Sequence, residues 1–285
     1  MTERRRSTLC VCLLLLFCIL SQSIGFLIMH GDVTYRLWQR IRPHRALQLE
    51  AVTPDGLCAW TLDTLLALDN VTLTTSLMLV NASHPLPDGY SAVLEEYNGA
   101  LMHPDMIGPY VAMRDEIQKR TGMRLYVSSD YRTREEQEAL LKESEAGVAA
   151  QLGCSEHEAG LALDVYVPYF AGEGFLQSRA GRLTGDISCN YGYVIRYPLD
   201  KEDITGIAYE PWHLRYVGEP HARLMTDAGL TLEEYIDSLS PDVWYSAHGY
   251  LISRQRVDSL CAPAGFDCCE VSFDNTGHCI LTVKM

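Results

Sequence analysis

The sequence predicts an α+β protein, because helix signals and short strand-like segments alternate along its 285 residues. Residues 107–121 place apolar side chains at helical spacing and are followed by Gly122, a residue type that commonly ends helices. Thr133 and Glu136 have the spacing of a capping box, which predicts a helix from Thr133 to about Lys142.

The predicted strands fall into two groups, one before residue 200 and one after residue 240. Helices are expected between the groups, at 219–229 and 232–239. The segments predicted as strands are residues 75–81, 124–129, 161–167, 191–197, 250–252, 270–273 and 279–283.

The tripeptide Asp-Tyr-Arg at 130–132 is expected to lie at the corner between the strand at 124–129 and the helix that follows, where side chains can face a cleft.

Charge and hydropathy indicate where the protein works. The formal net charge of −14 argues against a nucleic-acid partner, which would require a basic face. The only dense basic cluster, Arg4 to Arg6, precedes residues 7–29, a mainly apolar stretch without a charged side chain. This pattern predicts a membrane anchor that places the rest of the chain outside the cytoplasm. A cleaved signal peptide is the alternative, because residues 23–25 fit a cleavage site, and it also exports the protein.

Composition divides the chain into four predicted parts. These are an anchor or signal segment at 1–30, a stalk or lead-in at 31–60, the main domain at 61–239 and a small cysteine-containing β tail at 240–285. We expect the exported protein to be a monomer.

Seven cysteines lie beyond the N-terminal segment, and an oxidising compartment makes disulfides the default expectation. No CxxC pair occurs among them, so neither a thiolate metal site nor a redox motif is expected. Because seven is odd, at least one thiol stays free or pairs elsewhere. Cys154 and Cys189 either form a disulfide or are unrelated, and the sequence leaves both possibilities open.

Two separated motifs carry metal chemistry. SEHEAGLALD (155–164) supplies His157 and Asp164, and EPWHLRYVG (210–218) supplies Glu210 and His213. Two imidazoles and one carboxylate form a zinc-ligand set that leaves a coordination position open for water. Glu210 can then act as a general base that does not bind the metal. Taken alone, each histidine is more often a structural residue, and Glu210 has Arg215 as an alternative partner.

The two motifs, together with SSDYRTREEQ (128–137) and YGYVIRYPLDKEDITG (191–206), resemble those of the VanY-type D-alanyl-D-alanine carboxypeptidases. The resemblance covers roughly residues 75–238. It implies the fold that these zinc peptidases share with hedgehog signalling domains, a small and mostly antiparallel sheet with packed helices. It also implies zinc as the cofactor and a peptidase that acts on peptidoglycan stem peptides.

The resemblance assigns a role to each site residue. Zinc ligands are expected at His157, Asp164 and His213, and the catalytic base at Glu210. Arg132 is expected to stabilise the oxyanion, since its charge is fixed at any working pH. Asp130 departs from the family pattern, in which a small residue is common, so it either holds Arg132 or competes with substrate. Substrate contacts are expected at Gln137, Ser155, Tyr131 and Trp212.

The expected reaction is hydrolysis of the C-terminal D-alanine from stem peptides. Two alternatives within the enzyme class are an L,D-carboxypeptidase and an endopeptidase that cuts within the stem. A non-catalytic module that binds zinc and wall peptides is the alternative from another class. A pure binder would not need a base, so the presence of Glu210 argues against that last possibility.

Overall fold

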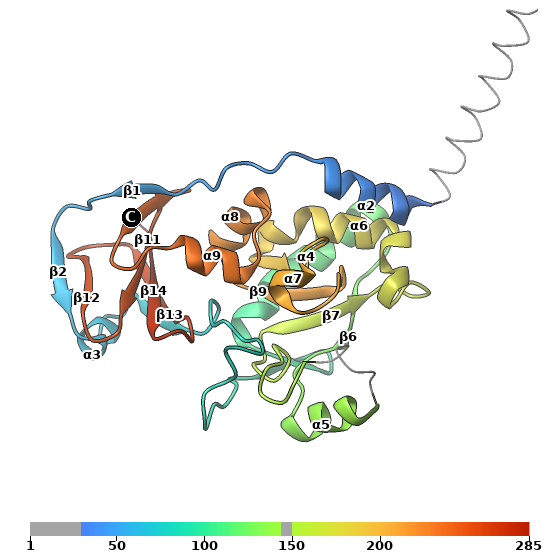
Figure 1. Cartoon of the computed structure of the whole chain (residues 1–285), viewed down its shortest axis with the longest axis horizontal. Coiled ribbons are helices and arrows are strands. Elements are labelled where there is room, and N and C mark those ends of the chain that lie inside the picture. The colour runs from blue at the N-terminus through green and yellow to red at the C-terminus, as the bar shows by residue number, and fades with distance from the viewer. Residues whose placement is uncertain (1–29, 144–149, 285) are drawn as a thin grey trace, which may run out of the picture.

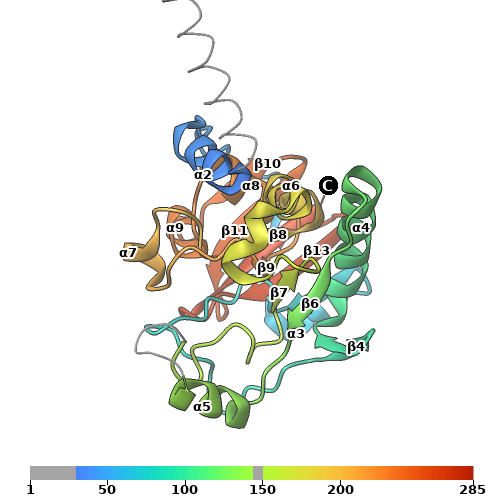
Figure 2. The same cartoon turned by 90° about the vertical axis from the view of Figure 1, so that its right-hand side faces the viewer.

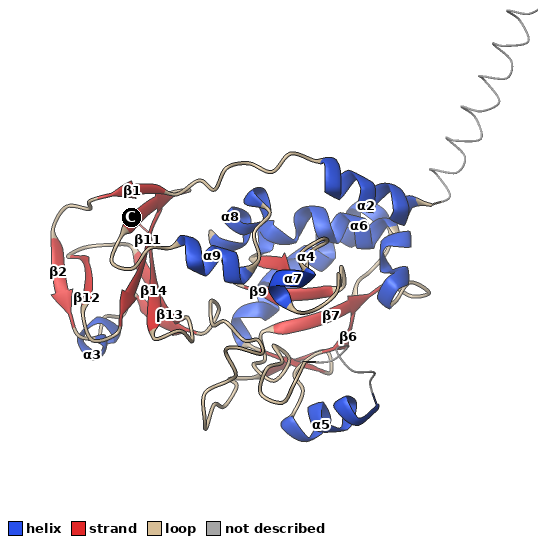
Figure 3. Ribbon diagram, viewed as in Figure 1, coloured by secondary structure: helices blue, strands red, loops and turns tan. Residues whose placement is uncertain are grey.

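The structure, a computed structural model of the chain, describes residues 30–143 and 150–284. A four-stranded sheet lies among the helices and a six-stranded sheet lies at one end of the molecule (Figures 1 and 3). This arrangement confirms the predicted α+β class. The predicted N-terminal membrane segment lies outside the described residues. Within the described part of the chain, no helix is both long and apolar enough to cross a bilayer.

The four-stranded sheet positions the functional residues. It consists, in spatial order, of β6 (Tyr126–Ser129), β7 (Ala162–Tyr166), β9 (His213–Tyr216) and β8 (Tyr193–Ile195), and each neighbouring pair is antiparallel. Leu163, Val165 and Leu214 join a buried core with two helices, α4 (Pro104–Thr121) and α6 (Arg179–Ile187). Because side chains alternate along a strand, Asp164 and His213 point to the opposite side of the sheet from this core.

Two of the predicted helices have the expected ends. Helix α4 ends before Gly122, which adopts the left-handed conformation with φ 74°. Helix α5 (Arg134–Glu143) follows Thr133, whose side chain accepts a hydrogen bond from the Glu136 backbone N–H at 3.2 Å. The Glu136 carboxylate accepts in return from the Thr133 N–H at 2.8 Å, so the predicted capping box is confirmed.

Helix α6 was not predicted, because Gly181 and Gly185 lower the helix propensity of its sequence. Both glycines allow close packing: a Cβ at Gly181 would lie 2.1 Å from the Phe175 carbonyl oxygen. The remaining helices are α2 (Gly31–Ile41), α3 (Leu62–Leu66), α7 (Glu202–Thr205), α8 (His221–Ala228) and α9 (Leu232–Ser238), with 3-10 turns η1 (Gly172–Gln177) and η2 (Ser188–Tyr191).

The six-stranded sheet combines both ends of the described chain. Its spatial order is β1 (Glu50–Val52), β10 (Trp244–Ala247), β11 (Tyr250–Arg256), β14 (His278–Lys284), β13 (Cys268–Phe273) and β3 (Val71–Thr74). Only the β13–β3 pair is parallel. Two further pairs are β2 (Leu57–Trp60) with β12 (Leu260–Pro263), and β4 (Glu95–Tyr97) with β5 (Ala100–Met102).

These pairings correct the predicted boundaries. Residues 31–60 were expected to be a stalk, but α2 packs against the helices and β1 and β2 pair with strands of the tail (Figure 1). The tail at 240–285 is therefore one part of a sheet that the N-terminal strands complete. Local patterns could not reveal this, since the pairing strands lie about two hundred residues apart in the sequence.

Residues 75–81 are not the predicted strand but a buried turn and loop. Several backbone groups of this loop form hydrogen bonds with side chains from distant parts of the chain. The Ser76 and Met78 carbonyls accept hydrogen bonds from Arg215, at 2.9 and 2.8 Å. The Leu77 N–H donates to Ser272 Oγ at 2.9 Å.

The predicted disulfides do not form among the described residues, where all seven cysteines are unpaired. Cys154 and Cys189 are therefore not bonded to each other. Cys189 packs in the apolar cluster around α8 and α9, whereas the Cys154 thiol donates to the Leu152 carbonyl oxygen at 3.7 Å.

Candidate active site

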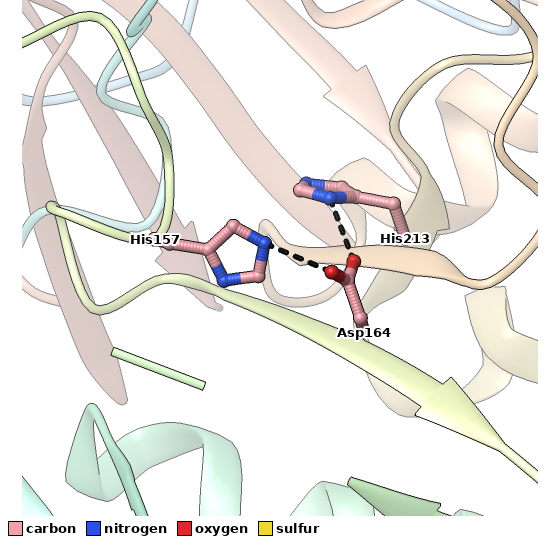
Figure 4. Close-up of side chains that lie close together, drawn as sticks. All are labelled: His157, Asp164 and His213. Atoms are coloured by element: carbon pink, nitrogen blue, oxygen red, sulfur yellow. Dashed lines mark ion pairs between the residues drawn. The ribbon is translucent and has the colours of Figure 1, made fainter. Parts of the chain in front are cut away.

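His157, Asp164 and His213 come together on the side of the four-stranded sheet opposite the core formed with α4 and α6 (Figure 4). Asp164 on β7 and His213 on β9 are direct cross-strand partners, which fixes the distance between their side chains. Asp164 Oδ1 lies 3.0 Å from His213 Nδ1, and Asp164 Oδ2 lies 3.4 Å from His157 Nε2. One ligand atom from each of the three residues lies within 4.8 Å of the others, as the sequence predicted.

The turn before β7 aims His157 at the other two residues. Its Nδ1 lies 2.7 Å from the Asp130 carbonyl oxygen, which can only accept, so Nδ1 carries the proton and Nε2 is left free for a metal. Gly160 ends this turn with φ 71°, and a Cβ there would lie 2.8 Å from the Leu94 side chain. The glycine is therefore required for the turn that presents His157.

The charges around the site favour a cation. Although burial opposes ionisation, the imidazoles of His157 and His213 hold the pKa of Asp164 well below its usual range. Burial lowers the pKa of His213, but the Asp164 and Glu156 carboxylates outweigh burial and raise it to about 9. A cluster that holds a proton this strongly has surplus negative charge, which a divalent cation would neutralise.

The hydrogen bonding of the site also fits a metal. Asp164 Oδ1 is buried and, apart from its ion-pair contact of 3.0 Å with His213 Nδ1, has no hydrogen-bond partner within the described residues. A buried polar atom without a partner is costly, and a bound zinc ion would give Asp164 a ligand bond in place of the missing one. Two imidazoles and a carboxylate are a donor set that zinc accepts.

Glu156 is a supporting residue that the sequence interpretation missed. Its side chain is fully buried, and its Oε2 lies 3.6 Å from His213 Nε2, on the side of the ring away from Asp164. Burial raises the pKa of a carboxyl group, but Arg215 and Arg196 hold that of Glu156 well below its usual range. The available signal was the presence of two further carboxylates, Glu156 and Glu158, in the same motif as Asp164.

Glu210 lies beside the ligands on the loop before β9. Its Oε2 is 3.8 Å from His213 Nδ1, and its backbone N–H donates to the Tyr197 carbonyl oxygen at 3.1 Å. Burial raises its pKa above the usual value. Arg215, the alternative partner considered from the sequence, instead pairs with Glu156 at 2.7 Å. Glu210 is therefore free to face the cavity.

These residues border a cavity of about 150 Å³. Arg132, Ser155 and Trp212 line it with the three metal-ligand candidates and Glu210, so the predicted oxyanion residue and two of the four predicted substrate contacts lie beside the ligand set. Arg132 is held by hydrogen bonds to Gln137 Oε1 and Ser129 Oγ, both at 2.8 Å. The lining residues are Arg132, Leu140, Ala150, Ser155, His157, Asp164, Tyr197, Ile207, Glu210, Trp212 and His213.

Gln137 and Tyr131 do not line the cavity. Gln137 is fully buried, accepts a hydrogen bond from Arg132 and donates to the Ala150 carbonyl oxygen at 2.6 Å, so it supports the cavity wall. Tyr131 lies against the turn at Gly160. Asp130 neither holds Arg132 nor enters the cavity, because its carboxylate accepts from the Leu101 backbone N–H.

Comparison with known proteins agrees with this site. Residues 99–219, which contain all three ligand candidates and Glu210, match the model of the family VanY: D-alanyl-D-alanine carboxypeptidase. The bifunctional D-Ala-D-Ala dipeptidase and carboxypeptidase VanXYC of Enterococcus gallinarum is 37% identical, over 59% of this chain and 97% of the relative. A D-alanyl-D-alanine carboxypeptidase of Enterococcus faecium is 34% identical, but the match spans only 59% of its length.

Three solved structures are similar as well. The D,D-dipeptidase VanXYg, in complex with a D-Ala-D-Ala phosphinate analogue, has a TM-score of 0.59 at 29% identity and covers 73% of this chain and 93% of its own. A D,D-pentapeptidase VanY in complex with Zn(II) scores 0.50 at 32% identity, over 56% and 98% of the two chains. The LD-carboxypeptidase LdcB scores 0.52 at 28% identity, over 68% and 99%.

The fold and the ligand set together define a zinc metallopeptidase. Within that class, the chain belongs to the VanY-type D-alanyl-D-alanine carboxypeptidase family, with which its cavity-lining motifs and the comparisons agree. It is an enzyme, and its cofactor is zinc. The predicted hedgehog-type peptidase fold is confirmed by the same neighbours.

Proposed function

We propose that this enzyme removes the C-terminal D-alanine from peptidoglycan stem peptides that end in D-Ala-D-Ala. The observation that carries the proposal is a non-ligating carboxylate, Glu210, beside a complete zinc-ligand set in one cavity. A protein that only bound wall peptides would have no use for that base. Family membership supports the choice of D-Ala-terminated substrates.

His157, Asp164 and His213 would hold zinc, which when bound supplies a Lewis acid and lowers the pKa of water. Glu210 accepts the proton of the attacking water, and burial, which raises its pKa, makes it a stronger base than an exposed carboxylate. It then returns the proton to the leaving amino group of D-alanine. This cycle leaves Glu210 ionised and ready for the next substrate.

Arg132 stabilises the negative charge that develops on the carbonyl oxygen of the scissile bond. It lines the cavity, and its hydrogen bonds to Gln137 and Ser129 fix the guanidinium before substrate arrives. A donor fixed in advance costs no reorganisation in the transition state, where the charge appears. Ser155 and Trp212 line the same cavity and would contact the peptide.

The products decide between this reaction and its alternatives. The purified, zinc-loaded full chain is incubated with a stem pentapeptide and a stem tetrapeptide, and the products are identified by mass. We expect the pentapeptide to lose one alanine and the tetrapeptide to stay intact. Loss of alanine from the tetrapeptide alone would assign an L,D-carboxypeptidase, and internal cleavage an endopeptidase. Glu210→Gln serves as the inactive control, which excludes a contaminating peptidase.

The proposal includes a location outside the cytoplasm, with the apolar residues 7–29 as a membrane anchor and the enzyme as a monomer. Carbonate extraction of membranes from expressing cells tests the anchor, because an integral protein stays in the pellet. Release of a shortened chain into the medium would instead indicate cleavage near residues 23–25. Light scattering of the detergent-solubilised protein tests the monomer.

A further inference from the structure

Helix α2 presents an apolar face to solvent. Val33, Leu37, Trp38 and Ile41 have exposed fractions of 47, 55, 44 and 69%. They are spaced four, five and eight residues from Val33, so they share one side of the helix. Four of the twelve large exposed apolar residues in the described part of the chain therefore lie on this eleven-residue helix.

The opposite face of α2 is fixed to the enzyme. Tyr35 is buried and donates a hydrogen bond to the Asp186 carboxylate on α6 at 2.9 Å. Gly185 allows this contact, because a Cβ there would lie 2.4 Å from the Tyr35 hydroxyl oxygen. Tyr209 donates to Gln39 Oε1 at 2.8 Å. Figure 2 shows α2 at the rim of the molecule, near α6 and α8. These contacts fix the direction in which the apolar face of α2 points relative to the rest of the enzyme.

The segment that carries the apolar face is rich in arginine, although the whole chain is acidic. Residues 31–49 contain four arginines and a single acidic residue, Asp32, in a chain of net charge −14. The Arg42 guanidinium lies 5.1 Å from the Trp38 ring centroid, directly beside the apolar stripe. Arg40 and Arg45 pair with Asp200 and Asp227, at 2.8 and 3.3 Å, in surface contacts that leave them solvated.

The sequence places this face next to the proposed anchor. Only one residue separates Gly31, the start of α2, from the charge-free residues 7–29. An extended residue spans at most about 3.6 Å. If those residues cross a bilayer, α2 lies within about 10 Å of its surface. Helices that lie in the membrane interface typically have apolar side chains and tryptophan on one face and basic side chains along the edge of that face.

We propose that α2 lies flat in the interface of an anionic phospholipid bilayer. This inference rests on the proposed anchoring by residues 7–29. Val33, Leu37, Trp38 and Ile41 contact the acyl chains near the headgroups, while Arg42 and its neighbours attract anionic headgroups. Because Tyr35 and Asp186 join α2 to the enzyme, the bilayer then fixes the height and orientation of the zinc cavity, which a single point of attachment would not do.

The test uses the full chain in vesicles of phosphatidylglycerol and phosphatidylcholine with brominated acyl chains. The fluorescence of the wild type minus that of Trp38→Phe isolates the emission of Trp38 from that of the other three tryptophans. We expect the bromolipid to quench this emission and aqueous iodide to leave it unchanged. Flotation of the vesicles, measured on the same samples, reports anchoring separately.

Two variants sharpen the measurement. Leu37→Ser with Ile41→Ser should expose Trp38 to iodide while peptide turnover in detergent stays unchanged, because neither residue lines the cavity. Val93→Ser, at an apolar residue that is 61% exposed but lies outside α2, is the matched control and should leave Trp38 shielded. Replacing the anionic lipid by phosphatidylcholine alone should weaken quenching by the bromolipid.

Three outcomes would overturn the inference. Chains that float with the vesicles but show Trp38 quenched by iodide would leave the anchor intact and refute the interfacial helix. Chains that do not float would refute both proposals. Trp38 shielded from both quenchers, in a chain that runs as a dimer, would assign the apolar face to a second copy of this protein.

Discussion

The substitution Glu156→Gln tests the role of the buried carboxylate behind the zinc site. Glu156 Oε1 accepts hydrogen bonds from Arg196 Nε at 2.6 Å and from Arg215 at 2.7 Å. Its Oε2 lies 3.6 Å from His213 Nε2, the imidazole nitrogen that points away from Asp164. A carboxylate on that side orients the ring and makes His213 a more basic ligand. Glutamine keeps the size of the side chain and removes its charge.

Two separate losses follow from this geometry. Removing such a carboxylate from behind a ligand histidine typically weakens metal binding by about 10- to 100-fold, which is about 1.4–2.7 kcal/mol. The two buried guanidinium groups also lose an anion, and breaking a buried ion pair costs about 3–5 kcal/mol of folding stability. The variant therefore binds zinc less tightly and its metal-free form unfolds at lower denaturant concentration.

Competition with a chelating dye measures the zinc affinity, and urea unfolding of the metal-free protein measures stability. Glu158→Gln is the matched control, because Glu158 is buried in the same motif but bonds to the Gly153 N–H and lies 3.7 Å from Arg134. It should leave zinc affinity close to that of the wild type. A folded Glu156→Gln protein with wild-type zinc affinity would refute a positioning role for Glu156.

Three further predictions concern the base, the oxyanion and the acid limit of stability. Glu210→Gln should retain zinc, measured by metal analysis, while turnover falls by about 10²- to 10⁴-fold; loss of the metal would make Glu210 a ligand instead. Arg132→Lys should lower kcat more than it raises KM, with →Ala more severe, whereas a change mainly in KM would indicate a grip on the substrate carboxylate. Burial lowers the pKa of His221 to about 3. Below pH 6.5, His221 therefore binds a proton in the unfolded chain but stays neutral in the folded protein. As the pH falls from roughly 6 to 4, this group should therefore lower the free energy of unfolding of the metal-free protein by up to about 1.4 kcal/mol per pH unit. Urea titrations of His221→Gln at several pH values should show a free energy of unfolding that depends less steeply on pH.

The sequence predicted the residues that meet at the zinc site because their signals are local. Asp164 stands out as a carboxylate in an apolar strand, and the antiparallel pairing of β7 with β9 brings it to His213. The helix that follows Arg132 was equally visible, since a capping box needs only residues three apart. Each of these features depends on a short stretch of chain or on a single strand pairing.

The features that escaped prediction depend on distant partners. Gln137 was expected to contact substrate, but it is fully buried. Its polar atoms form hydrogen bonds with Arg132 and with the Ala150 carbonyl oxygen, which makes this burial possible. Glu156 looked like an ordinary charged residue, because the two arginines that allow its burial lie 40 and 59 positions away. Residues 50–60 gave no sign of their strand partners beyond residue 240.

The same buried charges connect the zinc site to the six-stranded sheet. Arg215, paired with Glu156, also donates to the carbonyls of Ser76 and Met78 and so fixes the loop at 75–81.

That loop is bonded in turn to the sheet, through the Leu77 N–H to Ser272 and through Asn275 to the Leu79 carbonyl oxygen at 2.9 Å. A chain of direct contacts therefore runs from the ligand His213, through Glu156 and Arg215, to β13 and the turn that follows it. Since removing one member of a buried network leaves the others without partners, the tail is a support of the catalytic site and not an independent appendage.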